Sequence, residues 1–555
     1  MARKQTPLRI IPLGGLDGIG KNMTAFEYGE DMVLIDAGLM FPDDSQPGID
    51  LVLPDYTYVL ENEDKLRGII ITHGHEDHTG ALPYLLQDLT RKVPIYSSKL
   101  TLGIIEGKLA EHRLLNSPRL REVKDGVHLS LGVFSIDFFS MTHSIPAALG
   151  VYMRTPAGSV MHTGDFKLDQ TPIDGVTPNY QAIGRFASQG VDLLLSDSTN
   201  ATNPGFTPSE AAVGPAIRHI IKNATGRVFI ASFASHIHRL QQVCDASVAV
   251  GRKVVVTGRS MVQNTKVARE LGYLKIGDGD IIDAFEVDDI PDDKVVVLCT
   301  GSQGEPMSAL SRMATGDHKS LSITESDTVI ISATPVPGNE KSVQTVINAL
   351  SKIGCAVYDK SNTLVHVSGH GCQEELKLML AMTKPANFMP VHGEAVHLRA
   401  HARLAEQMGL DQRNIFVADN GDSLEMYDGK VRWGAPVASG VVYVEGRAVT
   451  GDDPVVFRDR QKLSDDGVIS CVVAIAAKTR TVQSVEIVAR GVSFAGDLEL
   501  MAEAREYVGE QMGKAAEHRD TGIASLSKSA RNCVSNYFWN RTHTRPMIIP
   551  VVVEV

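Results

Sequence analysis

One six-residue stretch limits the folds open to this chain more than any other feature. Residues 73–78 read His-Gly-His-Glu-Asp-His, directly after the apolar run 68–72. The run predicts a buried strand, and the loop after such a strand is where binding side chains tend to lie. Imidazoles and a carboxylate suit zinc, manganese or iron. Four ligands exceed the needs of one catalytic ion with an open position, so the stretch predicts two metals. The alternative is a polar loop with chance histidines.

The composition is that of a globular protein with several domains. The chain has 555 residues, too many for one core, so we expect two to four domains. Hydrophobic residues make up 43% and charged residues 22%, which is ordinary for a water-soluble protein. We see no apolar run of membrane-spanning length and no signal-peptide pattern. The six cysteines show no C-x-x-C spacing. We therefore expect reduced thiols and a cytoplasmic location, and neither a disulfide framework nor a zinc finger.

The formal net charge of −12 limits contacts with nucleic acid. An acidic chain does not attract a polyanion through its overall field. If nucleic acid binds, the positive charge must be local, in a groove, in bound metals or in a basic patch. The aromatics of the basic stretch 514–545 either stack on nucleic acid or, as we favour, pack a domain or an interface. This stretch holds Lys514, Arg519, Lys528, Arg531, Tyr537-Phe-Trp539, Arg541 and Arg545.

The order of apolar runs divides the chain into domains. Residues 1–206 predict stacked layers of sheet and helix. Residues 207–363 alternate helices and strands, beginning with a helix over 209–223, which is the pattern of a parallel α/β domain. Polar residues after apolar runs return in 364–435, so we interpret 207–363 as an insertion into the first domain. Residues 436–460 have the pattern of a strand-and-turn linker, and 461–555 that of a small α/β terminal domain.

Polar side chains follow apolar runs at six further places. Taken singly, each is as easily a cap, a turn residue or a satisfied buried group. Together with the histidine stretch they predict one edge of a sheet at which ligands converge. The six residues are Asp36, His143, Asp165, Asp197, His370 and His392.

Further motifs lie at 13–15 with 19–22, 35–42, 80–83, 163–166, 231–234, 300–306, 333–335 with 337–340, and 368–370. With the histidine stretch they resemble the metallo-β-lactamase superfamily, its β-CASP branch and, within that branch, the bacterial ribonuclease J family. The resemblance covers nearly the whole chain, although the histidine stretch alone indicates only the superfamily. It implies an α/β fold: an αββα metallo-β-lactamase sandwich with an inserted parallel α/β β-CASP domain and a small α/β C-terminal domain.

The resemblance implies a site with two divalent metal ions, Zn²⁺ or Mn²⁺, with Mg²⁺ as a further alternative. Two ions about 3.5–4 Å apart clamp the attacking and leaving oxygens of an in-line displacement. Asp36 and Asp197 resemble carboxylates that orient histidine ligands; for Asp36 the alternative is a turn residue. His73, His75, His143 and Asp165 would hold one ion, and Asp77, His78, His392 and the bridging Asp165 the other.

The same resemblance implies how a substrate binds. His370 would contact the transition state or protonate a leaving 3′ oxygen. Ser232 and Ser235 resemble residues that receive a terminal 5′-monophosphate; the alternative is that they cap the following helix. Histidine at position 392, where members that act on DNA tend to have valine, points to RNA. The family's nucleotide-binding loop, in which a glycine lets N–H groups approach a phosphate, would comprise His366, Val367, Ser368, Gly369 and His370.

We therefore expect a metal-dependent ribonuclease with 5′-to-3′ exonuclease and endonuclease activity on single-stranded RNA. It would prefer 5′-monophosphorylated RNA and act in rRNA processing and mRNA decay. One alternative is a metallo-hydrolase of a small ester, thioester or lactam, against which the inserted domain argues. The other is a catalytically silent RNA-binding subunit, against which the full ligand set argues.

The resemblance also suggests partners and a second kind of metal site. We expect a homodimer or homotetramer formed through the terminal domain, contacts with other RNA-decay proteins, and no association with membranes. Gly48, Asp50 and Glu445 resemble a peripheral Ca²⁺ site, for which ordinary surface turns are the alternative.

Overall fold

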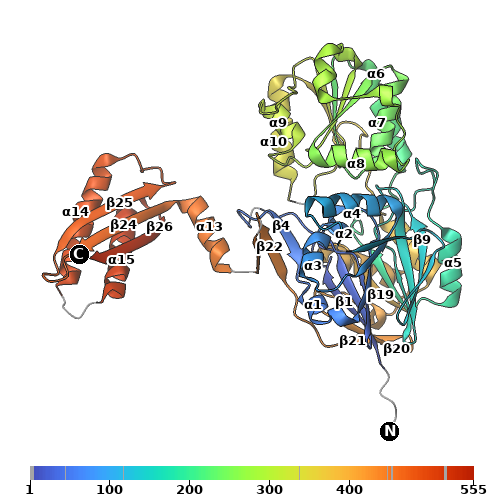
Figure 1. The fold of residues 1–555 in the computed structure, drawn as a ribbon, viewed down its shortest axis with the longest axis horizontal. Helices are drawn as coiled ribbons and strands as arrows, with labels where there is room; N and C mark the ends of the chain where they lie inside the picture. Colours follow the sequence, from blue (N-terminus) through green and yellow to red (C-terminus); the bar gives the residue numbers. More distant parts are fainter. Residues whose placement is uncertain are drawn as a thin grey trace, which may run out of the picture. The chain divides into compact units, whose positions relative to one another are not determined.

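The structure, a computed structural model, divides into two compact units (Figure 1). One comprises Met1–Phe41 and Leu51–Val442, and the other comprises Pro42–Asp50 and Tyr443–Val555. None of the described helices has the length and apolar character needed to cross a membrane. Pro337 of one predicted motif and Arg519 of the basic stretch lie outside the described residues. The structure describes residues 6–43, 45–116, 118–336, 338–446, 448–451, 454–517 and 522–555.

An eight-stranded sheet forms one inner layer of the larger unit. Strands β1 to β3 and β20 to β21 pair antiparallel, whereas β3, β5, β6 and β7 run parallel. The order is β21 (Lys430–Trp433), β20 (Leu424–Tyr427), β1 (Leu8–Gly14), β2 (Met23–Tyr28), β3 (Asp31–Ile35), β5 (Leu66–Ile70), β6 (Pro94–Ser97) and β7 (Arg119–Glu122).

A six-stranded sheet forms the other inner layer. Phe26 and Val33 of the first sheet share one buried core with Phe138 and Val151 of the second, so the two sheets pack face to face. The order is β19 (Asn387–Val391), β12 (Leu193–Asp197), β11 (Gly158–His162), β10 (Ala148–Thr155), β9 (Phe134–Met141) and β8 (His128–Leu131).

Helices cover the outer faces of both sheets, which gives the predicted αββα sandwich. Met379 and Phe186 on helices share a core with Met161 and Leu194 of the second sheet. Helix α4 packs on β6 and β7 of the first sheet. The helices are α1 (Thr57–Glu61), α2 (Glu76–Thr79), α3 (Leu82–Asp88), α4 (Lys99–Glu111), α5 (Tyr180–Gln189), α11 (Gln373–Thr383) and α12 (Ala395–Gln407), and the short strand β4 (Leu51–Pro54) belongs to neither of the two sheets.

Parallel strands bring the polar residues of the sequence to one edge. In the second sheet β11, β12 and β19 run parallel, and Asp165, Asp197 and His392 lie at or just after their carboxyl ends. In the first sheet β3 and β5 run parallel, and Asp36 and Thr72 follow them. Strand β19 comes after the inserted domain, so its pairing with β12 carries a distant segment into the same edge.

The inserted domain is a parallel sheet with helices on both faces, as predicted. Ile220 and Leu240 pack against one face, and Leu310 and Leu350 against the other. The strand order is β15 (Ile281–Ile282), β14 (Lys253–Thr257), β16 (Val295–Cys299), β13 (Val228–Ala231), β17 (Thr328–Ile331) and β18 (Ala356–Tyr358). The helices are α6 (Gly214–Asn223), α7 (Ile237–Ala249), α8 (Arg259–Glu270), α9 (Ala309–Thr315) and α10 (Glu340–Ile353).

The first helix of this domain is shorter than expected. The sequence predicts one helix over 209–223, but a 3₁₀ turn over Glu210–Val213 precedes α6. Pro215 lies at the start of α6. Its missing N–H and fixed φ are tolerated in a first turn but not inside a helix.

The smaller unit ends in a three-stranded sheet covered on one face by two helices. Val508 and Phe538 on these helices share a core with Ile469 and Val473 of the sheet. Strand β24 pairs antiparallel with β25 and parallel with β26. The elements are β22 (Val441–Glu445), β23 (Ala448–Gly451), α13 (Pro454–Asp466), β24 (Val468–Ile475), β25 (Val482–Arg490), α14 (Leu498–Ala516), α15 (Ile523–Thr542) and β26 (Met547–Glu554).

Two sequence expectations are refined in this unit. The strand-and-turn pattern predicted for residues 436–460 is wrong from residue 454 on, where helix α13 begins. Its proline stands at the first helical position, where a missing N–H costs nothing. Tyr537 and Phe538 are buried in the core, in agreement with the packing interpretation. Trp539 is 39% exposed, with the Arg545 guanidinium 4.3 Å from its ring. The domain boundaries themselves stay predictions.

Candidate metal centre

The histidine stretch forms the turn after β5 and the short helix α2. His73 and His78 are 0% and 2% exposed, whereas His75 and Asp77 are partly exposed. The Ala37 N–H donates to the carbonyl oxygen of His78 at 2.9 Å. The stretch is therefore fixed to the residues that follow β3, at the shared edge of the sheet.

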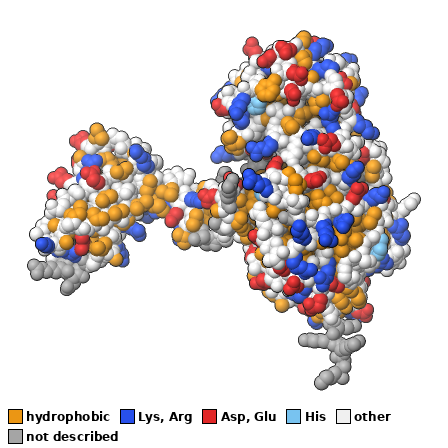
Figure 2. Space-filling view, viewed as in Figure 1, with side chains coloured by type: hydrophobic (Ala, Val, Ile, Leu, Met, Phe, Trp, Pro, Cys, Tyr) orange, Lys and Arg blue, Asp and Glu red, His pale blue; other side chains and the backbone are white. Residues whose placement is uncertain are grey.

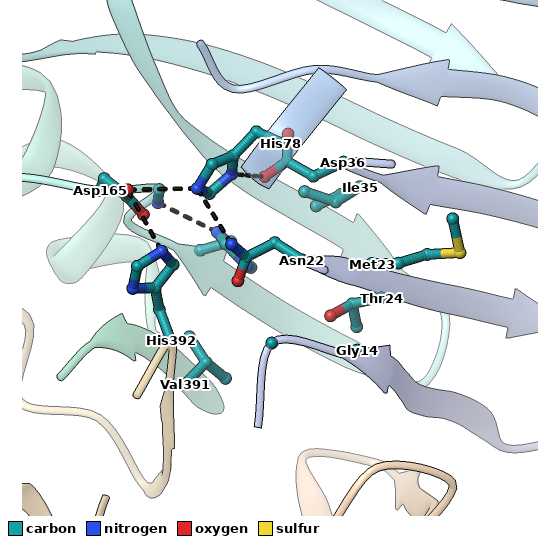
Figure 3. A pocket seen from close by; sticks show the side chains of 13 residues that line it. Gly14, Asn22, Met23, Thr24, Ile35, Asp36, His78, Asp165, Val391 and His392 are labelled. Atoms are coloured by element: carbon teal, nitrogen blue, oxygen red, sulfur yellow. Dashed lines mark hydrogen bonds and ion pairs between the residues drawn. The ribbon is translucent and has the colours of Figure 1, made fainter. Parts of the chain in front are cut away.

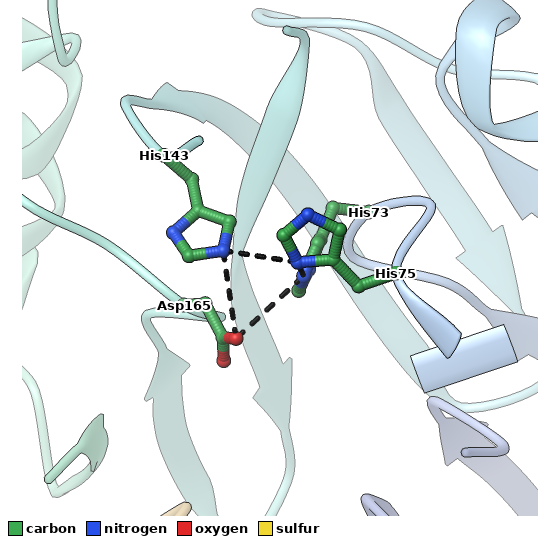
Figure 4. Close-up of side chains that lie close together, drawn as sticks. All are labelled: His73, His75, His143 and Asp165. Carbon is green, nitrogen blue, oxygen red and sulfur yellow. Dashed lines mark hydrogen bonds and ion pairs between the residues drawn. The ribbon is translucent and has the colours of Figure 1, made fainter. Parts of the chain in front are cut away.

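Four side chains from three segments form a first group of ligand atoms (Figure 4). Nδ1 of His75 lies 3.1 Å from Nε2 of His73 and 3.2 Å from Nε2 of His143. Oδ2 of Asp165 lies 3.6 Å from Nε2 of His73 and 3.8 Å from Nε2 of His143. The polar atoms of all four residues converge on one point.

A second group shares the same carboxylate, and Figure 3 shows its members Asp165, His78 and His392. Oδ2 of Asp165 lies 3.1 Å from Nε2 of His78 and 3.4 Å from Nε2 of His392. Oδ2 of Asp77 lies 3.4 Å and 3.1 Å from the same two nitrogens. Both groups thus include the Asp165 carboxylate, and the seven residues that the resemblance implies as ligands lie close together.

The donor set fits divalent metal ions. Four atoms around one tetrahedral ion at about 2.0–2.1 Å lie about 3.3 Å from one another. The separations within the first group are close to that value, and in each group all ligand atoms lie within 4.8 Å of one another. Buried imidazoles with two carboxylates offer lone pairs and negative charge, which a divalent cation complements.

Burial and charge set the protonation of the ligands. Burial lowers the pKa of His73 and His143, and lowers that of His75 to about 4. These imidazoles are therefore neutral, the form that binds metal. For His392 burial acts in the same direction, but the Asp165 carboxylate outweighs it and raises the pKa to about 9. Binding of a metal ion at the second group would therefore displace a proton from His392.

The ligand histidines have hydrogen-bond partners at their other ring nitrogen. Such partners fix the tautomer and the orientation of the ring. The pairs are His78 Nδ1 with Asp36 Oδ2 (2.8 Å), His392 Nδ1 with Thr199 Oγ1 (2.6 Å), His73 Nδ1 with Thr72 Oγ1 (3.0 Å) and His143 Nδ1 with the Gly369 carbonyl (2.8 Å).

Three of these contacts were not predicted from the sequence. Thr72 directly precedes His73, and Thr199 lies two residues after Asp197, so closeness to a strand end was the available signal. Gly369 was expected to let backbone N–H groups approach a phosphate, and in the structure its carbonyl oxygen contacts His143. A Cβ at Gly369 would lie 2.7 Å from the His143 ring, so this contact requires glycine.

The backbone is strained at two residues of the centre. Asp36 and His392 have φ angles of 62° and 56°. A residue other than glycine in this region costs about 1–3 kcal/mol, and such strain persists where the surroundings fix it, often at functional sites. At Asp36 the N–H still donates to the Ile70 carbonyl at 2.8 Å. Strain at both strand ends therefore turns the two side chains into the centre.

His370 and Asp197 lie beside the second group. Nδ1 of His370 lies 2.7 Å from Oδ2 of Asp197, whereas Nδ1 of His392 lies 3.7 Å from Oδ1 of Asp197. Asp197 therefore orients His370 more closely than a ligand histidine, which differs from the sequence interpretation. The His370 ring lies 4.9 Å from that of His143 and 5.4 Å from that of His392.

The predicted nucleotide-binding loop adjoins the centre. The His370 carbonyl accepts from Asn200 Nδ2 at 2.8 Å and from Thr207 Oγ1 at 2.6 Å. The N–H groups of residues 366–369 make no hydrogen bond within the described part of the chain. Carbonyl oxygens of the loop thus bind the scaffold, whereas its N–H groups at 366–369 have no partner among the described residues.

Ser232 and Ser235 lie in the segment before α7. The cap of α7 is His236, whose side chain accepts from the Arg239 N–H, so neither serine caps that helix. The His236 ring lies 6.4 Å from that of His366, which brings this segment to the loop. Oγ of Ser232 and Nδ1 of His366 are buried with no hydrogen-bond partner among the described residues.

The residues of the expected calcium site have other partners. Glu445 pairs with the Arg460 guanidinium at 2.5 Å, and Asp50 accepts from the Gly446 N–H at 2.6 Å. Arg460 also lies against Gly48. No cluster of ligand atoms at these positions occurs among the described residues, and the Ca²⁺ site stays a prediction.

Known proteins resemble the chain along its whole length. Family models match at 31–220 (Beta-lactamase superfamily domain), 225–350 (Ribonuclease J, beta-CASP domain), 356–418 (Zn-dependent metallo-hydrolase RNA specificity domain) and 455–555 (Ribonuclease J C-terminal domain). Ribonuclease J of Mycolicibacterium smegmatis is 40% identical over 549 residues, which cover 99% of this chain and 97% of that protein. The chain belongs to the ribonuclease J family. Membership confirms the predicted fold class and the predicted enzyme class, a metal-dependent ribonuclease.

Other similar proteins agree with this assignment. Ribonuclease J2 of Bacillus subtilis is 39% identical, with all of both chains covered. A solved structure of a protein of unknown function from Enterococcus faecalis superposes with a TM-score of 0.53 at 14% identity. It covers 76% of this chain and 100% of its own. That likeness shows the fold alone.

Proposed function

We propose that this ribonuclease J family member uses two metal ions to cleave RNA both internally and stepwise from the 5′ end, with a preference for a 5′-monophosphate. The observation that carries the proposal is the Asp165 carboxylate, which two ligand groups share beside a loop with unpaired N–H groups. Two ions suit a phosphodiester, and a site for one more phosphate beside them suits a 5′ end.

The metal ions and their ligand side chains would have different roles in the reaction. Two divalent ions held there would act as Lewis acids on the phosphoryl oxygens and lower the pKa of a water. Zn²⁺ and Mn²⁺ suit this nitrogen-rich set better than Mg²⁺, which prefers oxygen ligands. Asp165 and Asp77 supply the negative charge, and the neutral ring of His75 directs its lone pair at the first group.

His370 is placed to move a proton. Hydrolysis adds water to phosphorus and breaks the P–O3′ bond, and the leaving 3′ oxygen takes up a proton. Asp197 binds His370 at Nδ1, so the proton at Nε2 is the one available for transfer. Burial opposes the charged ring, but Asp197 outweighs it and raises the pKa of His370. The products are a 3′-hydroxyl and a 5′-phosphate.

The products connect the two proposed activities. Each cleavage leaves a new 5′-monophosphate on the downstream fragment. The N–H groups of 366–369 and the unpaired Ser232 hydroxyl would donate hydrogen bonds to this phosphate. An internal cut therefore creates a substrate for stepwise degradation from the 5′ end.

The variant Ser232→Ala tests the proposed terminal phosphate site independently of the metal centre. We expect the ratio of rates on 5′-monophosphorylated and 5′-hydroxyl RNA to fall about 10- to 10²-fold, the effect of one charge-assisted hydrogen bond of about 1.5–3 kcal/mol. The assay follows release of nucleotides from both RNAs, with 5′-triphosphorylated RNA alongside. Circular RNA, which has no 5′ end, measures internal cleavage and should be cut equally by both proteins.

Ser247→Ala is the matched control, because this serine is buried in the same domain and its hydroxyl is already bonded to the Val243 carbonyl. An unchanged ratio in Ser232→Ala, or an equal loss in Ser247→Ala, would refute the role of Ser232. A wild type that does not discriminate between the 5′ ends would refute the proposed preference.

The terminal domain offers a surface for a second copy of the chain. On the sheet face opposite the helices, Val472 pairs with Val551 and Ser470 with Val488 and Ile549. The valines at 472, 488 and 551 are 37%, 53% and 40% exposed, and hydrophobic side chains form a band across this unit (Figure 2). Contiguous apolar surface of this kind marks an interface, which supports the proposed homodimer or homotetramer.

Val551→Asp tests this surface. We expect a lower molar mass in light scattering at the same protein concentration, because a carboxylate is costly to bury in an apolar interface. Val248→Asp, on an exposed position of α7, is the control. An unchanged mass for Val551→Asp, or dissociation of both variants, would exclude this face as the interface.

A further inference from the structure

We propose that Lys167 is a positioning residue for RNA cleavage. With Asp169, Glu210 and Arg239 it forms a buried ionic chain that holds the nucleotide-binding loop in place beside the metal ligands. The inference rests on the proposed role of residues 366–370 in binding a terminal phosphate, and it adds the residues that keep that loop in register with the centre.

The side chain of Lys167 ends on the loop itself. Its Nζ donates to the carbonyl oxygen of Ser368 at 3.2 Å and to that of Pro208 at 3.3 Å, and it lies 3.7 Å from Asp169. The residue is 1% exposed. The ammonium group therefore ties the middle of the loop to the first residues of the inserted domain.

Stability alone does not account for a lysine at this position. Buried ion pairs can often be replaced by apolar side chains at no cost in stability. A charged group here has a clearer use in fixing the carbonyl oxygens of a polar loop.

The backbone of Lys167 is fixed to the metal ligands. The residue lies two positions after Asp165 on the same segment. Its N–H donates to the carbonyl oxygen of Thr142 at 2.8 Å, and Thr142 Oγ1 donates to its carbonyl oxygen at 2.5 Å. Thr142 directly precedes His143. Lys167 thus connects two segments that carry ligands with the loop that contacts substrate.

The other members of the ionic chain hold the loop from the side of the inserted domain. The Glu210 N–H donates to Asp169 Oδ2 at 2.9 Å. Arg239, which is 0% exposed, donates from Nη2 to Glu210 Oε1 at 2.5 Å and from Nη1 to the Val365 carbonyl at 2.6 Å. The loop is therefore held at its start by Arg239 and at its middle by Lys167, and the hydrogen bond from the Glu210 N–H to Asp169 joins the acidic partners of the two cations.

These tethers determine where the unpaired N–H groups of 366–369 lie. A shift of about 1 Å in a bound substrate can lower the rate by about 10²-fold. Loss of the Lys167 ammonium releases the Ser368 carbonyl but removes no metal ligand. Recognition of the RNA end should therefore suffer more than the metal centre.

The test compares Lys167→Met with Lys377→Met, which removes a lysine that pairs with Glu374 at the surface of α11. We would measure metal content, hydrolysis of bis(p-nitrophenyl) phosphate, and kcat and KM on 5′-monophosphorylated and 5′-hydroxyl RNA. In Lys167→Met we expect metal content to match the wild type and kcat/KM on 5′-monophosphorylated RNA to fall about 10²-fold. The ratio of RNA cleavage to hydrolysis of the small diester should fall with it. Lys377→Met should match the wild type throughout.

Two outcomes would overturn the proposal: an unchanged RNA-to-diester ratio in Lys167→Met, or a loss of metal that accounts for the whole decrease. If Lys167→Met fails to fold, Glu210→Gln is a second test of the proposal. This variant keeps the shape of the side chain while weakening its bond to Arg239. It should lower the same ratio. A wild type without preference for the 5′-monophosphate would contradict the proposed function instead, and the ratio would still test the positioning role.

Discussion

In the Asp165→Asn variant we expect RNA cleavage to fall by about 10³-fold or more, because this carboxylate serves both ligand groups. Its Oδ2 lies within 3.8 Å of imidazole nitrogens of His73, His78, His143 and His392. A neutral amide keeps the size but removes the charge that two cations share. Single-turnover cleavage of 5′-monophosphorylated RNA measures the rate, and elemental analysis of the purified protein measures bound metal.

Metal content should fall at both groups together in Asp165→Asn. Asp137→Asn is the control, since this carboxylate lies on β9 of the same sheet and pairs with Arg154 at the surface. Loss of one ion with the other fully retained would contradict a shared carboxylate. Activity near the wild-type level would contradict the assignment of the whole centre.

In the His370→Ala variant we expect the rate to fall by about 10²–10⁴-fold, the usual contribution of a general acid. Metal content should stay at the wild-type level, because neither proposed ligand group contains His370. Asp197→Asn should cause most of the same loss, since an amide at this position can stabilise the wrong tautomer of the ring. Single-turnover rates and elemental analysis again provide the measurements.

His128→Ala, on the exposed strand β8, controls for the loss of a histidine. His370 also belongs to a cluster of potential ligand atoms with Asp165, Asp197 and His392. A drop in metal content in His370→Ala would show that it is a ligand, and a rate close to that of the wild type would exclude it from proton transfer.

Much of the centre was predictable because strand ends are visible in the sequence. Asp36, Asp165, Asp197 and His392 all follow apolar runs, and parallel strands bring such ends to one edge. The pattern required no knowledge of how the strands are ordered. The histidine stretch added its ligands through local spacing alone.

The supporting contacts were not predictable in this way. Arg239 and Val365 are 126 positions apart, and Lys167 and Ser368 are 201 apart. In the sequence, Arg239 stands on a helix where a charged residue normally faces solvent, yet it is fully buried. Thr199 likewise can contact His392 only once β19 has paired with β12. Such hydrogen bonds depend on the tertiary arrangement, which local patterns do not contain.

The pairing of β19 with β12 has a consequence for synthesis of the enzyme. The first ligand group is complete once Asp165 has left the ribosome, but the second needs His392, and the edge of β12 stays open until Asn387–Val391 can pair with it. Closing a segment of this length is slow compared with local folding. A nascent chain that is still bound to its own messenger RNA through the ribosome therefore has only the first of the two ligand groups. We expect full activity only after most of the protein has been translated.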